Sequence, residues 1–455
     1  MITLRIDSQV HFGPMPEIPG AILNEIKRRL SFENPAYLEA KKRGFYTGNI
    51  AQQIRGYEIE GDRLIIPRGF TRQLVEMLHR AGVQYRIEDR RRTLPEEVFQ
   101  FLGFPYDFQA EAVEAMAARD FGTLAAPTGS GKTVVALALV AMRRQPALVV
   151  VHTRELMDQW ISRVETFLGI PAREVGIIGG GKMKMGDKIT VAMVQTLCKC
   201  APEVAPFIGN LIVDEAHRCP SRTFTEAVTA FDSWYMTGLS ATPWRRDGLS
   251  RLIYWYVGDK VHEIDKAALV KAGHVLQAEV VWRETDFEPT FDPSEEYSRM
   301  LSELTQDPAR NDLIAADVAR EAQGNGGGVC LVLSDRKSHV ETLAGLLEVR
   351  GIEAAILTGD LSNGERQAVV AALNAGKVKV LVATGQLIGE GFDCRDLSTL
   401  FLGTPIRFSG RLLQYLGRVL RPAPGKSRAV VVDYQDVNVP VLMNAARGRQ
   451  RVYGE

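Results

Sequence analysis

The chain has 455 residues, which is enough for two or three domains of ordinary size. Hydrophobic residues make up 45% of it and charged residues 24%, a balance typical of a globular protein able to bury large cores. The 55 basic and 55 acidic residues cancel, which excludes an overall basic field, so any nucleic-acid site must be local.

Five cysteines are few and scattered, a pattern that suits a reducing cytosol. Only Cys198 and Cys200 lie close together, and no second pair at zinc-ligand spacing accompanies them, so we expect no metal site there. The opening stretch "MITLRIDSQV" lacks the apolar segment of a signal peptide, and we find no apolar run long enough to span a bilayer. We therefore expect a cytoplasmic protein with no membrane partner.

Residues 1–100 are expected to form a small α+β accessory domain, for which nucleic-acid binding is one candidate role. The expected elements are helix 19–31, the hairpin "YEIEGDRLIIP" (57–67) with its turn at Gly61 and Asp62, helix 70–81 and strand 83–88. The charged stretch "EDRRRTLPEE" (88–97) then leads to the rest of the chain. Its arginines either contact nucleic acid or belong to a solvated connector.

From about residue 121, short apolar runs alternate with amphipathic helical stretches, which is the rhythm of βαβ units. The runs are nearly continuous in Val, Ile, Leu and Ala, as buried parallel strands are. They begin with "TLAAP" (123–127), "ALVVVH" (147–152), "KITVAM" (188–193), "NLIVDEAH" (210–217) and "WYMTGLSAT" (234–242).

The same rhythm fills two separate parts of the chain. We expect a first domain over residues 101–265 and a second over 326–455. Between them, the acidic and proline-interrupted residues 266–325 are expected to form a linker or insertion. The predicted fold class is therefore α/β, with two tandem doubly wound parallel-sheet domains preceded by the small α+β domain.

A glycine-rich loop, "APTGSGKT" (126–133), follows a predicted strand and opens a predicted helix. Gly129 and Gly131 would let the backbone wrap closely around phosphates, with the loop N–H groups and the helix N-terminus directed at the anion. The strict phosphate-loop pattern has glycine where this chain has Ala126, and a chance glycine-rich turn is the alternative. The position of the loop between a strand and a helix favours the phosphate site.

The side chains of this loop predict ATP as ligand and Mg²⁺ as its metal. Lys132 would reach the β- and γ-phosphates, and the hydroxyl of Thr133 would hold Mg²⁺. Thr128 and Ser130 complete the predicted ATP-binding loop.

Two adjacent carboxylates end the apolar strand in "LIVDEAH" (211–217). Asp214 is placed to hold the metal through water, and Glu215 can polarise the attacking water as a general base. Adjacent acids at a strand end could instead cap a loop, but the phosphate loop upstream favours the catalytic interpretation.

The stretch "GRLLQYLGRVLRP" (410–422) is predicted to be a helix ended by Pro422. Gln414, Arg418 and Arg421 stand at i, i+4 and i+7, so they share one face of that helix. A solvated polar stripe is the ordinary interpretation of such a face. If the two α/β domains face each other over ATP, the arginines would instead neutralise charge that develops on the γ-phosphate, an effect on the order of 10³–10⁵ in rate.

The loop and the carboxylates belong to a series of motifs that spans roughly residues 104–435. In chain order these are "FPYDFQAEAV" (104–113), "APTGSGKT" (126–133), "VHTRELMDQW" (151–160), "VAMVQTL" (191–197), "DEAH" (214–217), "LSATP" (239–243), "VLVATGQLIGEGFD" (380–393) and "QYLGRVLR" (414–421). The series resembles that of the superfamily 2 helicases with a DEAH box. The resemblance implies two tandem RecA-like domains that hydrolyse ATP and move along nucleic acid.

The resemblance also assigns roles to further side chains. Gln109 would read the adenine, and Tyr106 is a candidate stacking partner for it. The remaining assignments are Gly391 and Asp393 for ATP, His217, Ser240 and Thr242 for coupling hydrolysis to movement, and Arg154, Thr196, Ser334, Arg336 and Thr384 for the nucleic-acid backbone. Backbone contacts would let a motor step on any sequence. The two arginines of that last group could equally be helix-end charges, and its serine and threonines could be caps or turns.

Within the superfamily the chain looks most like the XPB-type and UvsW-type DNA helicases and translocases. The XPB group carries Arg-Glu-Asp shortly after the "SATP" motif, and here Arg245, Arg246 and Asp247 take that place. Arg246, a further candidate nucleic-acid contact, stands where the group has glutamate, so this chain departs from the strand-separating segment of that group. A small domain before the motor is also similar to UvsW-type architecture.

The function expected from these residues is an ATP-dependent DNA helicase or translocase in repair, recombination or defence. Its partner would be single-stranded, duplex or forked DNA, and a protein such as a nuclease is a further candidate partner. Two alternatives stay open at this point, an RNA helicase of the same motor type and a nucleotide-gated DNA-binding subunit of a larger complex. The ATP-site motifs do not separate DNA from RNA, because that distinction depends on contacts to the 2′-OH.

Overall fold

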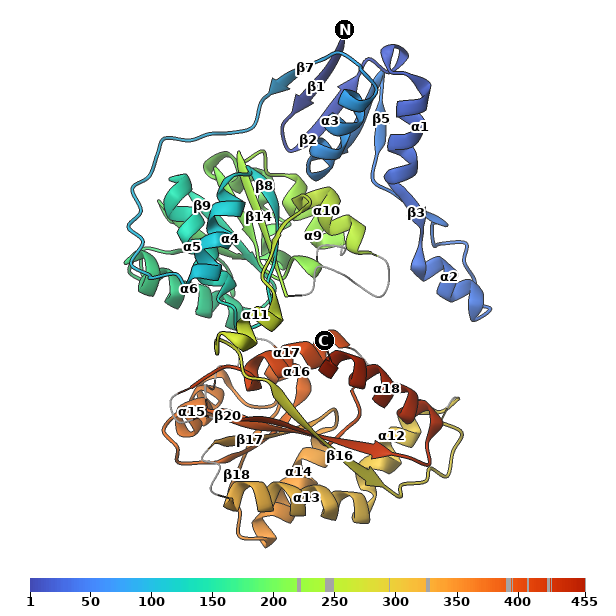
Figure 1. Ribbon diagram of the computed structural model, residues 1–455, viewed down its shortest axis with the longest axis vertical. Helices are drawn as coiled ribbons and strands as arrows, with labels where there is room; N and C mark the ends of the chain where they lie inside the picture. Colours follow the sequence, from blue (N-terminus) through green and yellow to red (C-terminus); the bar gives the residue numbers. More distant parts are fainter. Residues whose placement is uncertain are drawn as a thin grey trace. The chain divides into compact units, whose positions relative to one another are not determined.

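The computed structural model describes residues 1–218, 222–241, 249–293, 295–324, 328–389, 394, 396–406, 409–423, 426 and 428–454. These residues form two compact units, one of Met1–Pro127 and Gly131–Ile264 and the other of the residues from Asp265 onward, with which Thr128–Ser130 are grouped. The first unit contains a small α+β domain, blue in Figure 1, and a parallel-sheet domain that follows it. The second unit, yellow to red, contains another parallel-sheet domain. No helix within the described ranges is long and apolar enough to cross a membrane.

The N-terminal domain is built on a five-stranded sheet with the strand order β5-β6-β2-β1-β7. Its elements are β1 (Ile2–Ile6), β2 (Gln9–Gly13), η1 (Met15–Glu17), α1 (Gly20–Arg29), β3 (Ser31–Glu33), α2 (Pro35–Lys42), β4 (Gln53–Arg55), β5 (Glu58–Glu60), β6 (Arg63–Pro67), η2 (Arg68–Phe70), α3 (Thr71–Arg80) and β7 (Tyr85–Asp89). Glu60 pairs with Arg63 across the turn between β5 and β6, which confirms the predicted hairpin. Helices α1 and α3 and strand β7 confirm the other predicted elements.

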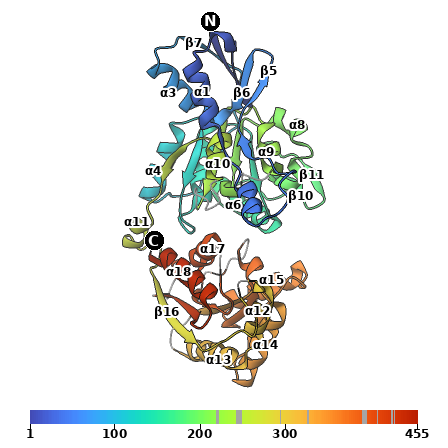
Figure 2. The same ribbon diagram turned by 90° about the vertical axis from the view of Figure 1, so that its right-hand side faces the viewer.

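The core of the N-terminal domain continues into the first sheet domain. The buried cluster includes Leu4, Phe12, Ile26, Leu74, Leu252 and Trp255, of which the last two belong to α10 (Ser250–Val257). Gly69 lies so close to α10 that an added Cβ would be 2.3 Å from the carbonyl oxygen of Tyr254. Helix α10 faces the N-terminal domain in both views (Figures 1 and 2). The two domains of the first unit therefore share one core.

The first sheet domain has eight strands in the order β11-β10-β12-β9-β13-β14-β8-β15, and all neighbours are parallel except β10 and β11. Its strands are β8 (Phe121–Ala125), β9 (Ala147–Val151), β10 (Gly176–Gly179), β11 (Lys182–Lys184), β12 (Ile189–Met193), β13 (Asn210–Val213), β14 (Tyr235–Ser240) and β15 (Lys260–Glu263). Its helices are α4 (Asp107–Ala117), α5 (Lys132–Arg143), α6 (Arg154–Leu168), α7 (Val194–Leu197), α8 (Ala201–Val204), η3 (Ala205–Phe207), η4 (Ala216–Arg218), α9 (Arg222–Thr229) and α10. The five predicted strands are confirmed, and their carboxyl ends meet at one edge of the sheet, where open parallel sheets bind ligands.

The second sheet domain has six parallel strands in the order β16-β21-β20-β17-β19-β18. Its strands are β16 (Ala278–Thr285), β17 (Val329–Ser334), β18 (Ala354–Leu357), β19 (Val380–Thr384), β20 (Leu397–Leu402) and β21 (Ala429–Asp436). Its helices are α11 (Lys266–Lys271), α12 (Tyr297–Gln306), α13 (Pro308–Gln323), α14 (Lys337–Val349), α15 (Asn363–Asn374), α16 (Gly385–Gly389), α17 (Ser409–Val419) and α18 (Pro440–Gly454). Helices α13 and α14 cover one face of this sheet and α17 and α18 the other (Figure 1). Both sheet domains are thus doubly wound and RecA-like, as expected.

Residues 266–325 are not only a linker, and that expectation is corrected here. Strand β16 pairs with β21 over eight positions, from Ala278 with Ala429 to Thr285 with Asp436, and so forms the edge strand of the second sheet. Helix α13 packs Ile314 and Val318 into the core of the same domain. The acidic stretch between β16 and α12 is interrupted by prolines and does not continue the βαβ pattern. For this reason the sequence did not predict the strand that precedes it.

Candidate nucleotide and nucleic-acid sites

The glycine-rich loop runs from the end of β8 to the start of α5 and needs its glycines. Gly129 and Gly131 have φ angles of 92° and 80°, a left-handed conformation that other residues rarely adopt. A Cβ added at Gly131 would lie 2.3 Å from Nε2 of Gln109, so the loop and the predicted adenine reader come together. Gln109 is buried, and its Oε1 accepts the backbone N–H of Tyr106 at 3.1 Å.

Tyr106 stands at the N-cap of α4 and is 56% exposed. Its ring stacks on that of Phe108, with centroids 5.7 Å apart and planes 14° apart. A ring that is largely exposed and lies next to Gln109 suits the expected contact with a base. The pair Tyr106 and Gln109 thus lies at the nucleotide loop, where the motif series predicted it.

Lys132 and Thr133 open α5, a helix of 12 residues. The Nζ of Lys132 donates a hydrogen bond to the carbonyl oxygen of Ala126 at 3.1 Å, which holds the ammonium over the loop. Ser130 is buried within the loop, and Thr128 precedes its first glycine. Backbone N–H groups, a lysine and a threonine at a helix start are the donor set that fits the phosphates of ATP and its Mg²⁺.

Asp214 follows β13 and is buried at the same sheet edge. The indole N–H of Trp160 donates to its Oδ2 at 2.8 Å, and the backbone N–H of Glu215 donates to its Oδ1 at 2.8 Å. Burial, followed by the charge of Glu215, raises the pKa of Asp214 to about 6. A buried carboxylate of this kind gains most from a nearby cation, so Asp214 fits a Mg²⁺ site together with Thr133.

Glu215 has a φ angle of 50°, a strained value for a residue with a side chain. Its Oε2 lies 3.1 Å from Nδ1 of His217, and the same nitrogen lies 3.4 Å from Oγ of Ser240. Ser240 ends β14, so the contacts join the carboxylate of one strand end to the hydroxyl of the next. The structure therefore brings together three of the predicted catalytic and coupling residues.

Four of the predicted site residues lie outside the described part of the chain. They are Thr242, Arg246, Gly391 and Asp393. Gln414 lies on α17, but its side chain is also outside the described part. The roles expected for these five residues stay predictions.

The predicted nucleic-acid residues of the first sheet domain follow adjacent strands. Arg154 opens α6 after β9, and Thr196 lies in α7 after β12; β9 and β12 pair in parallel, with Val151 opposite Met193. The hydroxyl of Thr153 caps α6 by accepting the N–H of Leu156 at 3.3 Å. Arg154 is exposed and Thr196 half-exposed, at the same edge as the phosphate loop. Both positions are compatible with a backbone contact and with a helix end.

The matching residues of the second sheet domain also meet at strand ends. Ser334 of β17 pairs in register with Thr384 of β19. Ser334 is buried, and its Oγ lies 2.9 Å from Nδ1 of His339 and accepts the N–H of Arg336 at 3.1 Å. This geometry is that of a turn-capping serine, the alternative that the sequence left open. Arg336 is half-buried and donates to Oγ of Ser298 at 3.0 Å.

The helix that carries the two predicted arginines is shorter than expected. Helix α17 ends at Val419, so Arg421 lies two residues beyond it and does not share its face by helical periodicity. Arg418 is buried, whereas Arg421 is half-buried. Nζ of Lys426 donates to the carbonyl oxygen of Arg421 at 2.7 Å and also bonds that of Val419. A lysine, which the sequence did not reveal, therefore fixes the backbone at Arg421.

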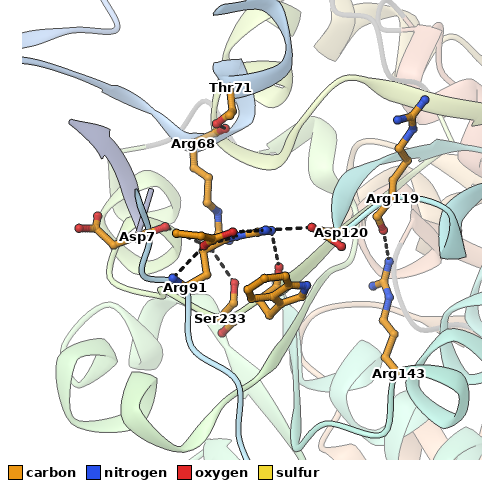
Figure 3. Close-up of polar contacts among 10 residues, drawn as sticks. Asp7, Arg68, Thr71, Arg91, Arg119, Asp120, Arg143 and Ser233 are labelled. Atoms are coloured by element: carbon orange, nitrogen blue, oxygen red, sulfur yellow. Dashed lines mark hydrogen bonds and ion pairs between the residues drawn. The ribbon is translucent and has the colours of Figure 1, made fainter. Parts of the chain in front are cut away.

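Two further polar contacts were not predicted from the sequence, and one of them, that of Trp160, is part of the site. Trp160 belongs to a quoted motif, but only the fold shows that its indole meets Asp214, 54 positions away. Arg143, at the end of α5, is buried and donates to Oγ1 of Thr237 at 2.7 Å. It also donates to the carbonyl of Arg119 at 3.0 Å (Figure 3). An arginine in an otherwise apolar helix stretch was the one available signal for this role.

The comparison with protein families gives two matches, one to each sheet domain. Residues 104–245 match the model "Type III restriction enzyme, res subunit", and residues 312–423 match "Helicase conserved C-terminal domain". The chain carries the two motor domains of a superfamily 2 helicase. We accordingly call its parallel-sheet domains the first and second motor domains.

Similar proteins agree with this assignment. The "Probable helicase D10" of Escherichia phage T5 is 26% identical over 83% of this chain and 81% of its own length. The "DNA 3'-5' translocase XPB2" of Sulfurisphaera tokodaii is 37% identical over 37% of this chain and 39% of its own length. S. cerevisiae Dbp5, solved with RNA and ADP BeF3, is 15% identical and shares the fold with a TM-score of 0.57 over 78% of this chain and 88% of its own. The helicase motor is an ATP-dependent one.

Proposed function

We propose that the chain is a DEAH-box motor that uses ATP hydrolysis to move along or remodel DNA. The observation that carries the proposal is the edge of the first motor sheet, where the glycine loop, Gln109, Asp214 and Glu215 gather. The similarity to an archaeal DNA translocase favours DNA as the substrate. RNA stays the alternative substrate for the same motor.

In this mechanism each residue has one task. The loop N–H groups and Lys132 bind the β- and γ-phosphates, and Gln109 with Tyr106 selects the base. Thr133 and Asp214 would hold Mg²⁺, which supplies positive charge at the phosphates when it is bound. Glu215 orients and polarises the attacking water. His217 and Ser240 transmit the change at the phosphates to the adjacent strand.

The arginines of the second motor domain complete the proposed site. Arg418 and Arg421, with Gln414, would neutralise the charge that develops on the γ-phosphate when the two motor domains close on ATP. The proposed DNA contacts are Arg154, Thr196, Ser334, Arg336 and Thr384. Protein partners such as a nuclease and a cytoplasmic location stay predictions from the sequence.

The deciding experiment measures the ATPase rate with single-stranded DNA, duplex DNA, a forked DNA and single-stranded RNA of matched length. DNA is expected to stimulate turnover, and Lys132→Ala should remove both basal and stimulated turnover. Stimulation by RNA alone would contradict the choice of DNA, and a binding-only subunit would show no turnover on any of the four.

A further inference from the structure

The N-terminal domain carries an arm that its own sheet does not need. Strands β3 and β4 form a short antiparallel pair, with Phe32 opposite Ile54, and enclose residues 34–52, which we call the α2 arm. The side chain of Asn34 closes the base of this arm. Its Nδ2 donates to the carbonyl of Ala51 at 2.9 Å, and its Oδ1 accepts the N–H of Ala36 at 3.1 Å. In Figure 1, α2 extends away from the five-stranded sheet.

The end of the α2 arm exposes large aromatic side chains. Tyr46 is 82% exposed and Phe45 is 64% exposed, whereas the other phenylalanines of the N-terminal domain pack inside its core or at its edge. A single exposed apolar residue is ordinary, but two adjacent aromatic rings at the end of a projecting segment form a patch that suits a partner. The partner must present flat apolar faces to such rings.

The charge of the α2 arm identifies that partner. Lys41, Lys42 and Arg43 follow one another at the end of α2 and are all exposed, and only Gly44 separates them from the aromatic pair. The only acidic residue of the arm, Glu39, pairs with Arg43. A basic run followed by exposed aromatic rings is the arrangement that binds single strands, because phosphates contact the cations and unpaired bases stack on the rings. Duplex DNA offers the phosphates but not the base faces.

The base of the α2 arm rests on the first motor domain. The ring of Phe32 packs on that of Trp255 in α10 with centroids 5.5 Å apart, and a Cβ added at Gly56 would lie 2.5 Å from the Trp255 ring. Helix α10 is the element that follows the "LSATP" motif in the chain. The arm is therefore attached to the same domain that binds ATP.

Arginines fix the remainder of the N-terminal domain to that motor domain. Arg68 is buried and donates to the carbonyl of Ser233 at 2.7 Å (Figure 3). The guanidinium of Arg91 lies 4.0 Å from the ring centroid of Trp234 and bonds Asp120 at 2.9 Å. Since these contacts and the shared core join the two domains, a strand held by the arm would move with the first motor domain.

We propose that the α2 arm is a second DNA-binding site that holds single-stranded DNA, with unpaired bases stacked on Phe45 and Tyr46 and phosphates on Lys41 and Lys42. The inference rests on the proposed function, since the strand it holds is the one on which the motor acts. No motif of the helicase series includes these residues.

The first test is the double variant Phe45→Ala, Tyr46→Ala in the full chain. Stacking contributes about 1–3 kcal/mol per base, so the affinity for a labelled oligothymidine is expected to fall about tenfold or more. Affinity for a blunt duplex should not change. Because both rings are exposed, the fold should persist, which thermal unfolding checks. Phe207→Ala, an exposed phenylalanine of the first motor domain, is the matched control and should bind both probes like the wild type.

The ATPase readout separates the arm from the catalytic site. The double variant should need about tenfold more oligothymidine to reach half-stimulation, while its turnover at saturating oligothymidine equals that of the wild type. An unchanged affinity for oligothymidine, or an equal loss for the duplex, would overturn the proposal. If the wild type binds oligouridine more tightly than oligothymidine, and the double variant loses that binding, the choice of DNA would be overturned. If no nucleic acid stimulates the wild type, the proposed function itself fails.

A charge test addresses the phosphate contacts independently. For single strands, the slope of log affinity against log salt changes by about 0.7 per phosphate contact, so Lys41→Gln, Lys42→Gln should reduce it by about 1.4. The matched control is the double variant Lys377→Gln, Lys379→Gln. Both lysines precede β19 and so lie at its amino end, whereas the site residues follow the carboxyl ends of the strands; their replacement should leave the slope unchanged. An unaltered slope in the first pair would contradict the phosphate contacts of the arm.

Discussion

Each motor domain buries an aspartate, Asp214 directly after β13 and Asp433 within β21, but the two domains neutralise it differently. In the first domain, Asp214 accepts hydrogen bonds from the indole of Trp160 and the backbone of Glu215, and burial raises its pKa to about 6. In the second domain, Asp433 accepts two bonds from the guanidinium of Arg449, both at 2.7 Å. Within the described ranges, Asp214 forms no ion pair with any side chain.

The presence or absence of an arginine partner distinguishes a structural aspartate from one that is available for catalysis. An arginine that forks onto a buried carboxylate joins elements permanently, as Arg310 also does when it bonds Asp436 at 2.7 Å and the carbonyl of Gly403. A carboxylate buried beside a neutral indole leaves its charge for a cation that arrives with the substrate. In this chain the counter-charge, more than burial itself, therefore indicates which aspartate serves catalysis.

The largest expected effect concerns Arg421, which we propose acts on the γ-phosphate during hydrolysis. Arg421→Ala should lower ATP turnover by about 10³-fold or more, because it removes a charge that stabilises the developing γ-phosphate. Binding of ATP should stay close to that of the wild type, since Lys132 and the loop bind the phosphates. Single-turnover hydrolysis and binding of a fluorescent ATP analogue measure the two effects. Arg451→Ala, an exposed arginine of α18, is the control, and a variant that loses only DNA binding would refute the role.

Glu215→Gln tests the acid beside Asp214. Loss of a general base should reduce turnover by roughly 10²–10⁴-fold while ATP still binds. Steady-state turnover with saturating ATP measures it, and Glu203→Gln, exposed on α8, should behave like the wild type. Near-normal turnover in Glu215→Gln would remove this residue from the catalytic group and leave Asp214 as an isolated buried acid.

Two matched substitutions, Asp433→Asn and Asp214→Asn, test the distinction between the two aspartates through the free energy of unfolding. Asp433→Asn should destabilise the second motor domain by roughly 3–5 kcal/mol, because it leaves the guanidinium of Arg449 buried without its counter-charge. Asp214→Asn should leave the free energy of unfolding unchanged or higher, since it removes a costly buried charge, yet it should abolish turnover. Chemical denaturation and ATPase activity per folded molecule give the two readings.

The control for this pair is Asp312→Asn, which removes an exposed partner of Arg350 and should change stability little. If Asp214→Asn unfolds more readily than Asp433→Asn, the distinction between catalytic and structural aspartates is wrong.

The sequence predicted those parts of the molecule whose signals are local. Residues 126–133 and 214–217 are contiguous motifs, and the buried strands around them are continuous apolar runs, so the loop, the carboxylates and the positions of these strands along the chain could be predicted. The β1–β2 hairpin was missed, although Ile2, Leu4 and Ile6 alternate with polar residues as a half-buried strand requires.

Charges whose partners are distant in the sequence could not be predicted. Arg91 and Arg92 looked equally like solvated or nucleic-acid-binding residues, but Arg91 bonds the carbonyl of Trp234 and Arg92 bonds Asp232 twice at 2.9 Å, 143 and 140 positions away. The same holds for Lys426, whose contact fixes the backbone of Arg421. Only the folded chain brings these groups together, so periodicity carries no information about them.

His339 extends the comparison to a buried group that stays neutral. It lies in α14 with Nδ1 2.9 Å from Oγ of Ser334 and Nε2 2.8 Å from Oδ1 of Asn311. Burial, followed by the charge of Arg310, lowers its pKa from 6.5 to about 3. Like Asp214, His339 forms no ion pair within the described part of the chain, but it can avoid its charge by remaining unprotonated at neutral pH.

This neutrality predicts the smallest effect, a loss of stability in mild acid. Below pH 6.5 the unfolded chain binds a proton at His339 that the native state does not, so the free energy of unfolding falls by about 1.4 kcal/mol per pH unit. Urea denaturation between about pH 6.5 and pH 5 should show a loss of roughly 2 kcal/mol that His339→Gln lacks. The exposed histidine of α3 supplies the control, since His79→Gln should follow the wild type. If the stability of His339→Gln falls with pH as that of the wild type does, the imidazole of His339 is not held neutral in the native state.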